Sequence, residues 1–365
     1  MDLSPRATID HAALRHNLER VRQAAPDSRI WAVVKANAYG HGVAEVTRSL
    51  DADGFAVARL QEARQLRELG LRGPILIMGG VCSTQTLRQA QASDCEIAVH
   101  SAYQAELLLR EPASARFRVW LKVNTGMNRL GLPPEEAAHW LERLTDCAAV
   151  NAVPGLMTHL ANADDPSDPF SEIQCRRLRA IPGARSTALN IGNSAGILGI
   201  EAARTDWVRP GIMLYGVSPF NGEIAAVWDL KPVMTLRSGL LAVNACHKGD
   251  RVGYGGTYLC PEDMRVGVIG AGYGDGYPRH APAGTPVLLE GRRAPLVGRV
   301  SMDTITVDLR GHPEVEIGDE VILWGRGLPA EEIARAAGTI AYELLTSVTE
   351  RVKREHINLN RSQVG

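Results

Sequence analysis

The chain has 365 residues, 45% of them hydrophobic, which is enough to bury one large core and a second, smaller one. Its 40 basic and 41 acidic residues form no long run of like charge, which argues against nucleic acid or an anionic membrane as a partner. No window approaches the ~20 consecutive apolar residues that span a bilayer, and residues 1–10 lack the apolar region of a signal peptide. These features predict a cytoplasmic protein of two domains that acts on a small molecule.

The six cysteines show neither CxxC spacing nor pairing with histidines at the intervals of a metal site. They are Cys82, Cys95, Cys147, Cys175, Cys246 and Cys260. In a chain of this length we expect them to be reduced thiols, and we predict no metal site.

After one amphipathic helix, predicted from Leu14, Leu18 and Val21 at helical spacing, short apolar runs alternate with segments of helical periodicity. The eight apolar runs are Ile30 to Lys35, Gly54 to Ala58, Pro74 to Met78, Glu96 to Val99, Phe117 to Val123, Asn151 to Thr158, Ser186 to Asn190 and Trp207 to Ile212. A strand followed by a helix, eight times over, predicts a closed parallel (β/α)₈ barrel of the TIM type. An open doubly wound sheet is the alternative, but no GxGxxG follows the first run.

From about Trp228 the pattern changes to apolar runs separated by Gly, Asp and Pro turns, which is typical of β structure. The runs are Thr235 to Val243, Arg265 to Ile269, Thr285 to Leu289, Ile305 to Leu309 and Glu320 to Leu323. Only Glu331 to Ala337 has helical spacing here. The sequence therefore predicts a barrel domain over residues 1–228 and a mostly β C-terminal domain over residues 229–365, with the boundary near residues 222 to 232.

The first apolar run ends at Lys35, and Asn37, Gly40 and Gly42 break the pattern directly after it. A lysine charge at the rim of a core is costly unless it is paired, shifted in pKa or used covalently, for example in a Schiff base with a carbonyl cofactor. A strand-end lysine that extends its charge into solvent is the alternative. Lys35 is thus the first catalytic candidate.

Polar side chains also belong to the last four predicted barrel strands and the loops after them, at the barrel end where such enzymes carry their chemistry. In chain order, the candidates are Lys122, Arg129, His159, Ser194 and Arg209. Each alone has a structural explanation, such as a solvated arginine or a helix-capping serine. Together with a lysine after the first strand, donors after the seventh and eighth strands match the phosphate site that barrels build there.

The segment AVVKANAYGHG, from Ala32 to Gly42, resembles the cofactor-lysine segment of alanine racemases, and the similarity extends from about Ala7 to Arg354. By this resemblance Lys35 carries pyridoxal 5'-phosphate (PLP) as a Schiff base, and Tyr39 contacts the cofactor. The resemblance also implies interconversion of L- and D-alanine by a homodimer with shared active sites. The product would supply peptidoglycan synthesis, or the reaction would serve alanine catabolism.

The resemblance implies further cofactor contacts by residues after the last barrel strands and near the C-terminus. These are His159, Asn193, Ser194, Arg209, Gly211, Ile212 and Tyr342, of which Ser194, Gly211, Ile212 and Tyr342 would hold the phosphate with Tyr39. Arg209 would face the pyridine nitrogen. Because arginine keeps its proton at any working pH, it leaves the cofactor a weaker electron sink. That suits a reaction that returns the proton to Cα.

Racemisation needs one base on each face of a planar intermediate. Lys35 would serve the D-enantiomer, and Tyr254 in VGYGGTY resembles the family's second base, which the partner subunit's β domain supplies. A hairpin tyrosine without a catalytic role is the alternative. Since a free tyrosine has a pKa near ~10, it needs nearby positive charge to act as a base, and by the resemblance His159 and Arg209 belong to the network that provides it.

Two later segments, GAGYGDGYPR and VGRVSMD, resemble the family's entrance and substrate segments. By the resemblance, Met302 binds the substrate carboxylate through its backbone N–H with help from Arg129, and Asp303 is a further substrate-binding residue. The entrance residues would be Tyr273, Arg279 and Arg299.

The fifth strand runs into LKVNTGM, where the family most often has KVDTGM, so Asn124 departs from the pattern. Lys122 corresponds to a lysine that is often carbamylated in this family. That modification turns a cation into an anion and can orient Arg129.

Three other functions stay open. A barrel that binds PLP without turnover would resemble the first domain only, and the segments of Tyr254 and Met302 argue against it. A PLP decarboxylase of basic amino acids shares the fold, but the ending TSVTERVKR resembles that of the racemases. A broad-specificity racemase is the third, although its known secreted type carries a signal peptide.

Overall fold

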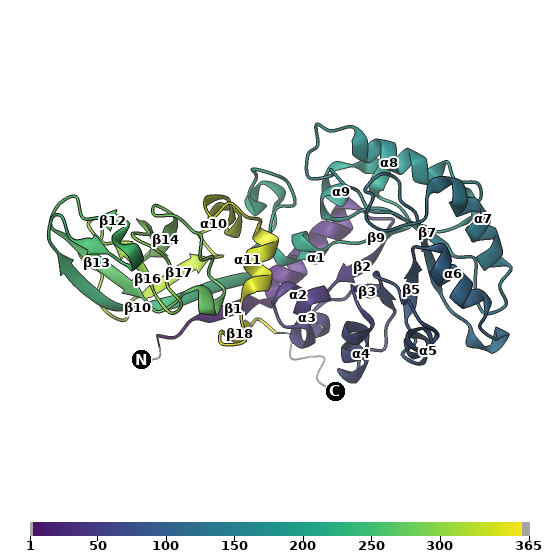
Figure 1. Ribbon diagram of the computed structural model, residues 1–365, viewed down its shortest axis with the longest axis horizontal. Coiled ribbons are helices and arrows are strands. Elements are labelled where there is room, and N and C mark those ends of the chain that lie inside the picture. The colour runs from purple at the N-terminus through teal and green to yellow at the C-terminus, as the bar shows by residue number, and fades with distance from the viewer. Residues whose placement is uncertain (1–2, 360–365) are drawn as a thin grey trace.

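The computed structural model describes residues 3–359, so residues 1–2 and 360–365, at the outer ends of the two predicted domains, lie outside it. The molecule is elongated, with a barrel of strands and helices at one end and a β-rich domain at the other (Figure 1). Helices α1 (His11–Ala24) and α11 (Ala341–Ser347) lie between these two parts. Leu14, Leu18 and Val21, which predicted the first helix, are all buried on α1.

Eight parallel strands close into a barrel in which each strand pairs with the next and the last pairs with the first. The strands are β2 (Arg29–Val33), β3 (Gly54–Val57), β4 (Ile75–Ile77), β5 (Glu96–Val99), β6 (Val119–Lys122), β7 (Gly155–Met157), β8 (Leu189–Asn190) and β9 (Trp207–Val208). Each overlaps one of the eight predicted runs. The predicted (β/α)₈ barrel is therefore confirmed, and the open sheet is excluded.

Helices and short 3₁₀ turns connect the barrel strands, and two further 3₁₀ turns follow the last of them. The α-helices are α2 (Lys35–Tyr39), α3 (Val43–Ser49), α4 (Leu60–Glu68), α5 (Thr84–Ala92), α6 (Ala102–Leu109), α7 (Pro134–Thr145), α8 (Phe170–Arg179) and α9 (Ser194–Gly199). The 3₁₀ turns are η1 (Ala113–Ala115), η2 (Ala184–Ser186) and η3 (Glu201–Ala203) and, after β9, η4 (Ile212–Tyr215) and η5 (Ala225–Trp228). Helix α4 buries Leu60, Ala63 and Leu66, whose spacing of three places them on one helical face.

Aromatic rings pack where the barrel closes. Trp31 of β2 stacks on Trp207 of β9 with ring centroids 4.4 Å apart. A Cβ on Gly54 of β3 would lie 2.3 Å from the Trp31 ring, so only glycine fits there. This packing fixes β2, whose C-terminal end carries Lys35.

The second domain is built on one eight-stranded sheet in which six strands follow the order β15-β14-β17-β10-β1-β18, while β13 pairs with β10 and β16. Its strands are β1 (Arg6–Asp10), β10 (Met234–Cys246), β13 (Met264–Ile269), β14 (Pro286–Leu289), β15 (Arg292–Pro295), β16 (Ile305–Asp308), β17 (Glu320–Trp324) and β18 (Lys353–Ile357). A separate hairpin consists of β11 (Arg251–Val252) and β12 (Tyr258–Leu259). All five predicted runs form strands, so the mostly β C-terminal domain is confirmed.

Two features of this domain differ from the prediction. Strand β1 lies in the range assigned to the barrel, yet it pairs with β10 and β18 in the β sheet, so the chain begins in one domain and crosses to the other. The expectation of a single helix was wrong, because α11 follows α10 (Ala330–Ala336). The boundary at residues 228 and 229 stays a prediction and falls between η5 and β10.

All six cysteines are free thiols. Within residues 3–359, no helix combines the length and the apolar character that crossing a bilayer requires. The same residues contain no cluster of His, Cys, Asp and Glu side chains suited to a metal ion.

Candidate active site

Lys35 lies at the C-terminal end of β2, half-buried at the mouth of the barrel. Its Nζ is 6.0 Å from the centre of the Tyr39 ring. Burial and the positive charge of Arg129 lower the pKa of Lys35, while the carboxylate of Glu62 acts in the opposite direction. A larger fraction of this amine is therefore neutral near pH 7 than for a free lysine, which suits a nucleophile or a base.

The backbone after Lys35 is left-handed over four consecutive residues that are not glycine. Ala36, Asn37, Ala38 and Tyr39 have φ angles of 52° to 53°. A left-handed helical conformation costs roughly 1–2 kcal/mol per residue in L-amino acids, so the surroundings must hold this turn in place. Such strain is concentrated at functional sites in proteins.

Side chains from three parts of the chain hold the turn. The N–H of Ala36 donates to Oε1 of Glu62 at 2.7 Å. The buried His41 contacts the carbonyl oxygens of Ala38 and Tyr39 through Nδ1, at 3.0 and 2.9 Å. Arg354 of β18 donates from Nε to the carbonyl oxygen of Gly40 at 2.7 Å. Because β18 belongs to the β domain, both domains fix the loop that follows Lys35.

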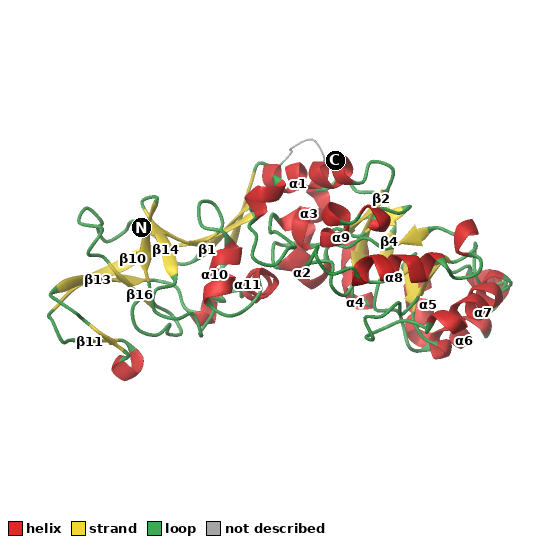
Figure 2. Cartoon of the chain, turned by 90° about the horizontal axis from the view of Figure 1, so that it is seen from above, coloured by secondary structure: helices red, strands yellow, loops and turns green. Residues whose placement is uncertain are grey.

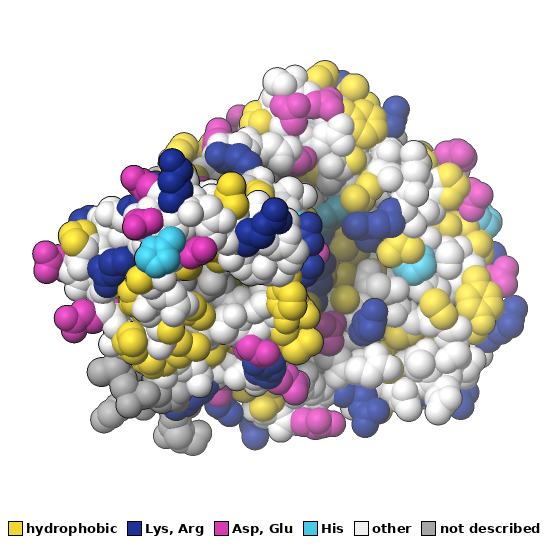
Figure 3. Space-filling view, turned by 60° about the vertical axis from the view of Figure 1, so that its left-hand side comes forward, with side chains coloured by type: hydrophobic (Ala, Val, Ile, Leu, Met, Phe, Trp, Pro, Cys, Tyr) yellow, Lys and Arg dark blue, Asp and Glu magenta, His cyan; other side chains and the backbone are white. Residues whose placement is uncertain are grey.

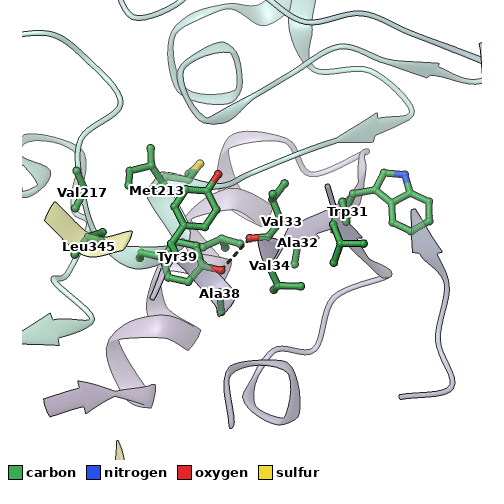
Figure 4. Packing of buried hydrophobic residues seen from close by; sticks show 14 of the residues in the cluster. Trp31, Ala32, Val33, Val34, Ala38, Tyr39, Met213, Val217 and Leu345 are labelled. Carbon is green, nitrogen blue, oxygen red and sulfur yellow. Dashed lines mark hydrogen bonds between the residues drawn. The ribbon is translucent and has the colours of Figure 1, made fainter. Parts of the chain in front are cut away.

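Three tyrosine rings cluster beside this turn. Tyr39 stacks on Tyr215 with centroids 4.7 Å apart, and its ring lies 6.1 Å from that of Tyr342 on α11. The Tyr215 hydroxyl donates to the carbonyl oxygen of Val33 at 2.9 Å. Figure 4 shows Tyr39 packed among the buried side chains near Val33 and Leu345. Burial raises the pKa of Tyr342 to about 12, so both its hydroxyl and that of Tyr39, whose pKa is also raised by burial, stay protonated donors.

The loops after β8 and β9 bring backbone N–H groups towards Tyr39. Ser194 Oγ accepts from the N–H groups of Gly211 and Met213, at 2.9 and 3.3 Å. A Cβ on Gly211 would lie 2.5 Å from the Tyr39 hydroxyl oxygen, so glycine is required at this close approach. Within the described part of the chain, the N–H groups of Ser194 and Ile212 have no hydrogen-bond acceptor. This set of donors fits an anion such as a phosphate.

The Arg209 side chain is buried, and the residue stands two positions before Gly211. Its guanidinium donates to the carbonyl oxygens of Asn190, Thr158 and Ile191, at 2.7, 2.6 and 3.2 Å, and also to the Asn190 side chain. Burial lowers the pKa of Arg209 to about 10, so it still carries its charge at neutral pH. Among the described residues no acceptor faces its Nε, which leaves one N–H for an acceptor such as a ring nitrogen.

Other basic side chains gather around Arg209. Lys122, the last residue of β6, is buried, and burial together with Arg209, Arg129 and Lys35 lowers its pKa to about 8. Burial and the same neighbours hold the pKa of His159 well below its usual value. His159 is therefore neutral at pH 7, so the positive charge expected from it and Arg209 together comes from Arg209 alone.

Asn124, the residue that departs from the family motif, accepts the hydrogen bonds that form the turn after β6. Its Oδ1 accepts from the N–H groups of Gly126 and Asn128, at 3.1 and 2.9 Å, and its Nδ2 donates to Asn128 Oδ1 at 2.9 Å. An aspartate could accept the first two bonds but could not donate the third. The asparagine therefore keeps the turn and adds a bond within it.

The predicted second base, Tyr254, and the substrate and entrance residues predicted in the β domain belong to loops of that domain and not to the barrel. Tyr254 opens the turn η6 (Tyr254–Gly256) between β11 and β12, and it is 71% exposed. This hairpin lies at the end of the molecule opposite the barrel (Figure 2), so the chain does not bring Tyr254 to Lys35. Arg299 lies beside the same turn, because a Cβ on Gly255 would lie 3.4 Å from its guanidinium.

Met302 and Tyr273 belong to two interlocked loops of the β domain. The N–H of Tyr273 donates to the carbonyl oxygen of Ser301 at 3.0 Å, and that of Gly274 to Met302 at 2.9 Å. Arg351 donates to Asp303 at 2.8 Å. Next to them, Arg279 and Tyr273 line a cavity of about 210 Å³ against α11. Helix α11 contacts both groups, since Tyr342 lies beside Tyr39 while Glu343 lines that cavity.

A larger cavity of about 560 Å³ lies beside the barrel mouth, between the loops after β7 and β8 and helices α10 and α11. His159, Asn193 and Tyr342 are among its lining residues. Figure 3 shows the surface hollowed between the two lobes of the molecule. The volume is in the range of small-molecule sites.

Three residues that hold the Lys35 loop, Glu62, His41 and Arg354, were not predicted from the sequence. Glu62 could have been found, because it stands three residues after Arg59, the N-cap of α4, where a capping glutamate reaches back to the backbone. Arg354 gave no such signal, because its contact with Gly40 joins residues far apart in the chain.

The fold and the arrangement of basic side chains and N–H donors at one end of the barrel define a two-domain barrel enzyme. Residues 9–219 match the family model of the alanine racemase N-terminal domain, and residues 233–356 match that of the alanine racemase C-terminal domain. The chain is 51% identical over 351 residues to the alanine racemase of Nitrosococcus oceani, covering 96% of this chain and 98% of that one. It is 50% identical over 364 residues to that of Thioalkalivibrio sulfidiphilus, covering 98% and 100%.

Solved structures agree with these relatives. The biosynthetic alanine racemase from Pseudomonas aeruginosa superimposes with a TM-score of 0.93 at 43% identity, over 98% of this chain and 99% of that one. The alanine racemase from Acinetobacter baumannii gives a TM-score of 0.92 at 38% identity, over 97% and 99%. The chain belongs to the alanine racemase family, and it is an enzyme of the isomerase class.

Proposed function

We propose that the protein interconverts L-alanine and D-alanine with PLP as cofactor and with Lys35 and Tyr254 as its two bases. The observation that carries the proposal is the strained left-handed turn, which contains Tyr39: its ring centre lies 6.0 Å from the Lys35 amine, and its hydroxyl closely approaches Gly211. Family membership supports the reaction. A cofactor store without turnover would not need the β-domain loops of Tyr254 and Met302.

The residues at the barrel mouth fit PLP. The N–H groups of Ser194 and Ile212 and the hydroxyls of Tyr39 and Tyr342 would hold its phosphate, with Asn193 capping the short helix at this point. Nε of Arg209 would meet the pyridine nitrogen. When bound, PLP supplies a conjugated electron sink that acidifies Cα of the amino acid.

The chain's own residues would then divide the work of moving a proton. Lys35, whose pKa is lowered, would bind the cofactor and exchange a proton at Nζ on one face of Cα. Arg209 would keep its proton, because its pKa of about 10 lies well above neutral pH. His159 would stay neutral and act as a hydrogen-bonding group in the same network.

The second base would come from another copy of the chain. Tyr254 is exposed at the end of the β domain away from Lys35, which supports a homodimer in which each site takes Tyr254 from the partner. Met302 and Asp303 would then contribute to substrate binding with Arg129, while Tyr273, Arg279 and Arg299 would line the entrance. The Met302 loop is held in place by its bond from Gly274.

Lys122 is suited to carbamylation. Its pKa of about 8 leaves a reactive neutral amine available near neutral pH, and the charges that act on it are the cations Arg209, Arg129 and Lys35. Conversion to a carbamate would place an anion among these cations and orient Arg129. The expected observation is a carbamate carbon signal by NMR in ¹³C-labelled bicarbonate, absent from Lys122→Met.

The test of the proposed reaction is loss of optical rotation from L-alanine, followed together with the visible absorbance of bound PLP. We expect racemisation of alanine with bound cofactor. Release of CO₂ from lysine or arginine, or bound PLP without turnover, would contradict the proposal. A cytoplasmic location and a role in supplying cell-wall D-alanine belong to the same proposal, and fractionation and rescue of a D-alanine auxotroph test them.

A further inference from the structure

Glu62 connects the ends of the first two barrel strands. Its Oε1 accepts from the N–H of Ala36 at 2.7 Å, directly after Lys35. Its Oε2 accepts from the N–H groups of Ala58 and Arg59, at 2.8 and 3.0 Å, where β3 ends and α4 begins. One carboxylate thus serves three backbone donors from two loops at the barrel mouth.

We propose that Glu62 is a positioning residue for the reaction, which fixes the peptide after Lys35 and so directs the Lys35 amine towards the cofactor. The inference rests on the proposed role of Lys35. The left-handed residues begin at Ala36, and Glu62 is the side chain that holds the N–H of that first residue. Since the turn is strained, losing this bond would let Ala36 relax and the lysine side chain swing away.

The chemistry of the contact requires a carboxylate. Both oxygens of Glu62 face N–H donors. A glutamine would therefore point its NH₂ group, which is itself a donor, at an N–H group of one of the two loops. Glu62→Gln therefore breaks one side of the connection and removes a negative charge. Glu62→Asp keeps the charge but is one methylene shorter, so it loses reach.

The charge acts on Lys35 together with the surrounding cations. Arg129 lowers the pKa of Lys35 and Glu62 raises it, while the charge of Lys35 in turn lowers the pKa of Lys122 and of His159. Removing the charge of Glu62 should move the titration midpoint of Lys35 to lower pH. Shortening the side chain should leave the midpoint closer to that of the unmodified chain. The two variants thus separate position from charge.

A matched control lies at the other end of the same strand. Asp53 accepts from the N–H of Ile30 at 2.9 Å, so it too anchors β2 through a carboxylate, but at the end away from Lys35. Asp53→Asn should disturb β2 without changing the amide of Ala36 or the titration of Lys35.

The experiment uses the full chain with and without PLP. Hydrogen exchange of the Ala36 amide, followed by NMR, should become about tenfold faster in Glu62→Gln and in Glu62→Asp, and should be unchanged in Asp53→Asn. In the chain without PLP, the pH dependence of acetylation of Lys35, read by mass spectrometry, should shift downwards in Glu62→Gln only. In the loaded enzyme, kcat should fall about tenfold to a hundredfold in both Glu62 variants.

Unchanged exchange at Ala36 in both Glu62 variants would overturn the proposal, as would an equal change in Asp53→Asn. If Glu62→Gln does not fold, the exchange of Ala36 and the kcat of Glu62→Asp decide the question on the same criteria. Failure of the proposed function looks different. In that case Lys35→Ala would keep its PLP absorbance, while exchange at Ala36 would still depend on Glu62.

Discussion

The two proposed bases lie in very different surroundings. Lys35 follows a buried strand, and side chains from α4 and β18 hold the loop after it. Tyr254 is 71% exposed on a short hairpin whose turn depends on glycines with positive φ, among them Gly253 and Gly255. A side chain that is held in place by its own chain takes up its position when that chain folds. An exposed side chain forms part of an enclosed site only when another surface packs against it. The difference agrees with the proposal that Lys35 is positioned within each chain and that Tyr254 acts at an interface between two chains.

The largest expected effect follows from removing Lys35, the proposed base that is held in place within its own chain. Lys35→Ala should lower kcat by more than about 10⁴-fold and abolish the visible absorbance of bound PLP, because in the proposed mechanism the amine is both the attachment point and a base. The fold should persist, since Lys35 is only half-buried. Absorbance spectra and racemisation of alanine measure both, and retained absorbance would contradict the assignment.

Removing Tyr254, the exposed proposed base, should leave the binding of the cofactor unchanged. Tyr254→Phe should lower kcat by about 10²–10⁴-fold through the loss of one proton-transfer group, with the PLP spectrum unchanged. Because the side chain is exposed, the free energy of unfolding should change by less than about 0.5 kcal/mol. Denaturant titration and single-enantiomer kinetics check this, and normal racemisation in both directions would remove Tyr254 from the mechanism.

A smaller effect tests the proposed phosphate site around Gly211. Gly211→Ala would place a methyl group 2.5 Å from the Tyr39 hydroxyl oxygen. We expect PLP to bind about tenfold more weakly, since Tyr39 must move away from the donor set. Equilibrium dialysis with PLP measures the affinity, and Gly311→Ala, where no atom lies within 4 Å of the added Cβ, is the control. Equal affinities of the two variants for PLP would contradict the proposed phosphate site around Gly211.

A last effect, on stability and not on activity, concerns the cations around Arg209. Burial and neighbouring cations lower the pKa of Lys122 from 10.5 to about 8. Between these two values the unfolded chain binds a proton that the folded chain lacks, so this group makes stability rise with pH there and leaves it flat below about pH 8. In buffer free of bicarbonate, the difference in unfolding free energy between the unmodified chain and Lys122→Met should rise by about 3 kcal/mol across this window. A flat or falling difference would contradict the burial of a cation.

Much of this arrangement could be predicted from the sequence. Alternating apolar runs and helical segments predicted the barrel strands, because local patterns reflect which face of each element is buried. Strand β1 and helix α11 were missed: β1 owes its place to partners more than two hundred residues away, and α11, unlike α10, has no basic residue in its last turn to mark its end. The left-handed turn at Ala36–Tyr39 was also missed, because no glycine marks it and distant side chains such as Arg354 help to hold it.

The central claim is that each site combines Lys35 of one chain with Tyr254 of another, and subunit exchange tests it most directly. Lys35→Ala and Tyr254→Phe dimers, each nearly inactive, are mixed until their subunits exchange at random, and mass spectrometry confirms heterodimers. About half of the dimers should then be mixed, and each should hold one site with both bases intact, so alanine racemisation should recover to about a quarter of the unmodified activity. Heterodimers without any recovery would show that Tyr254 acts within its own chain or is not the second base.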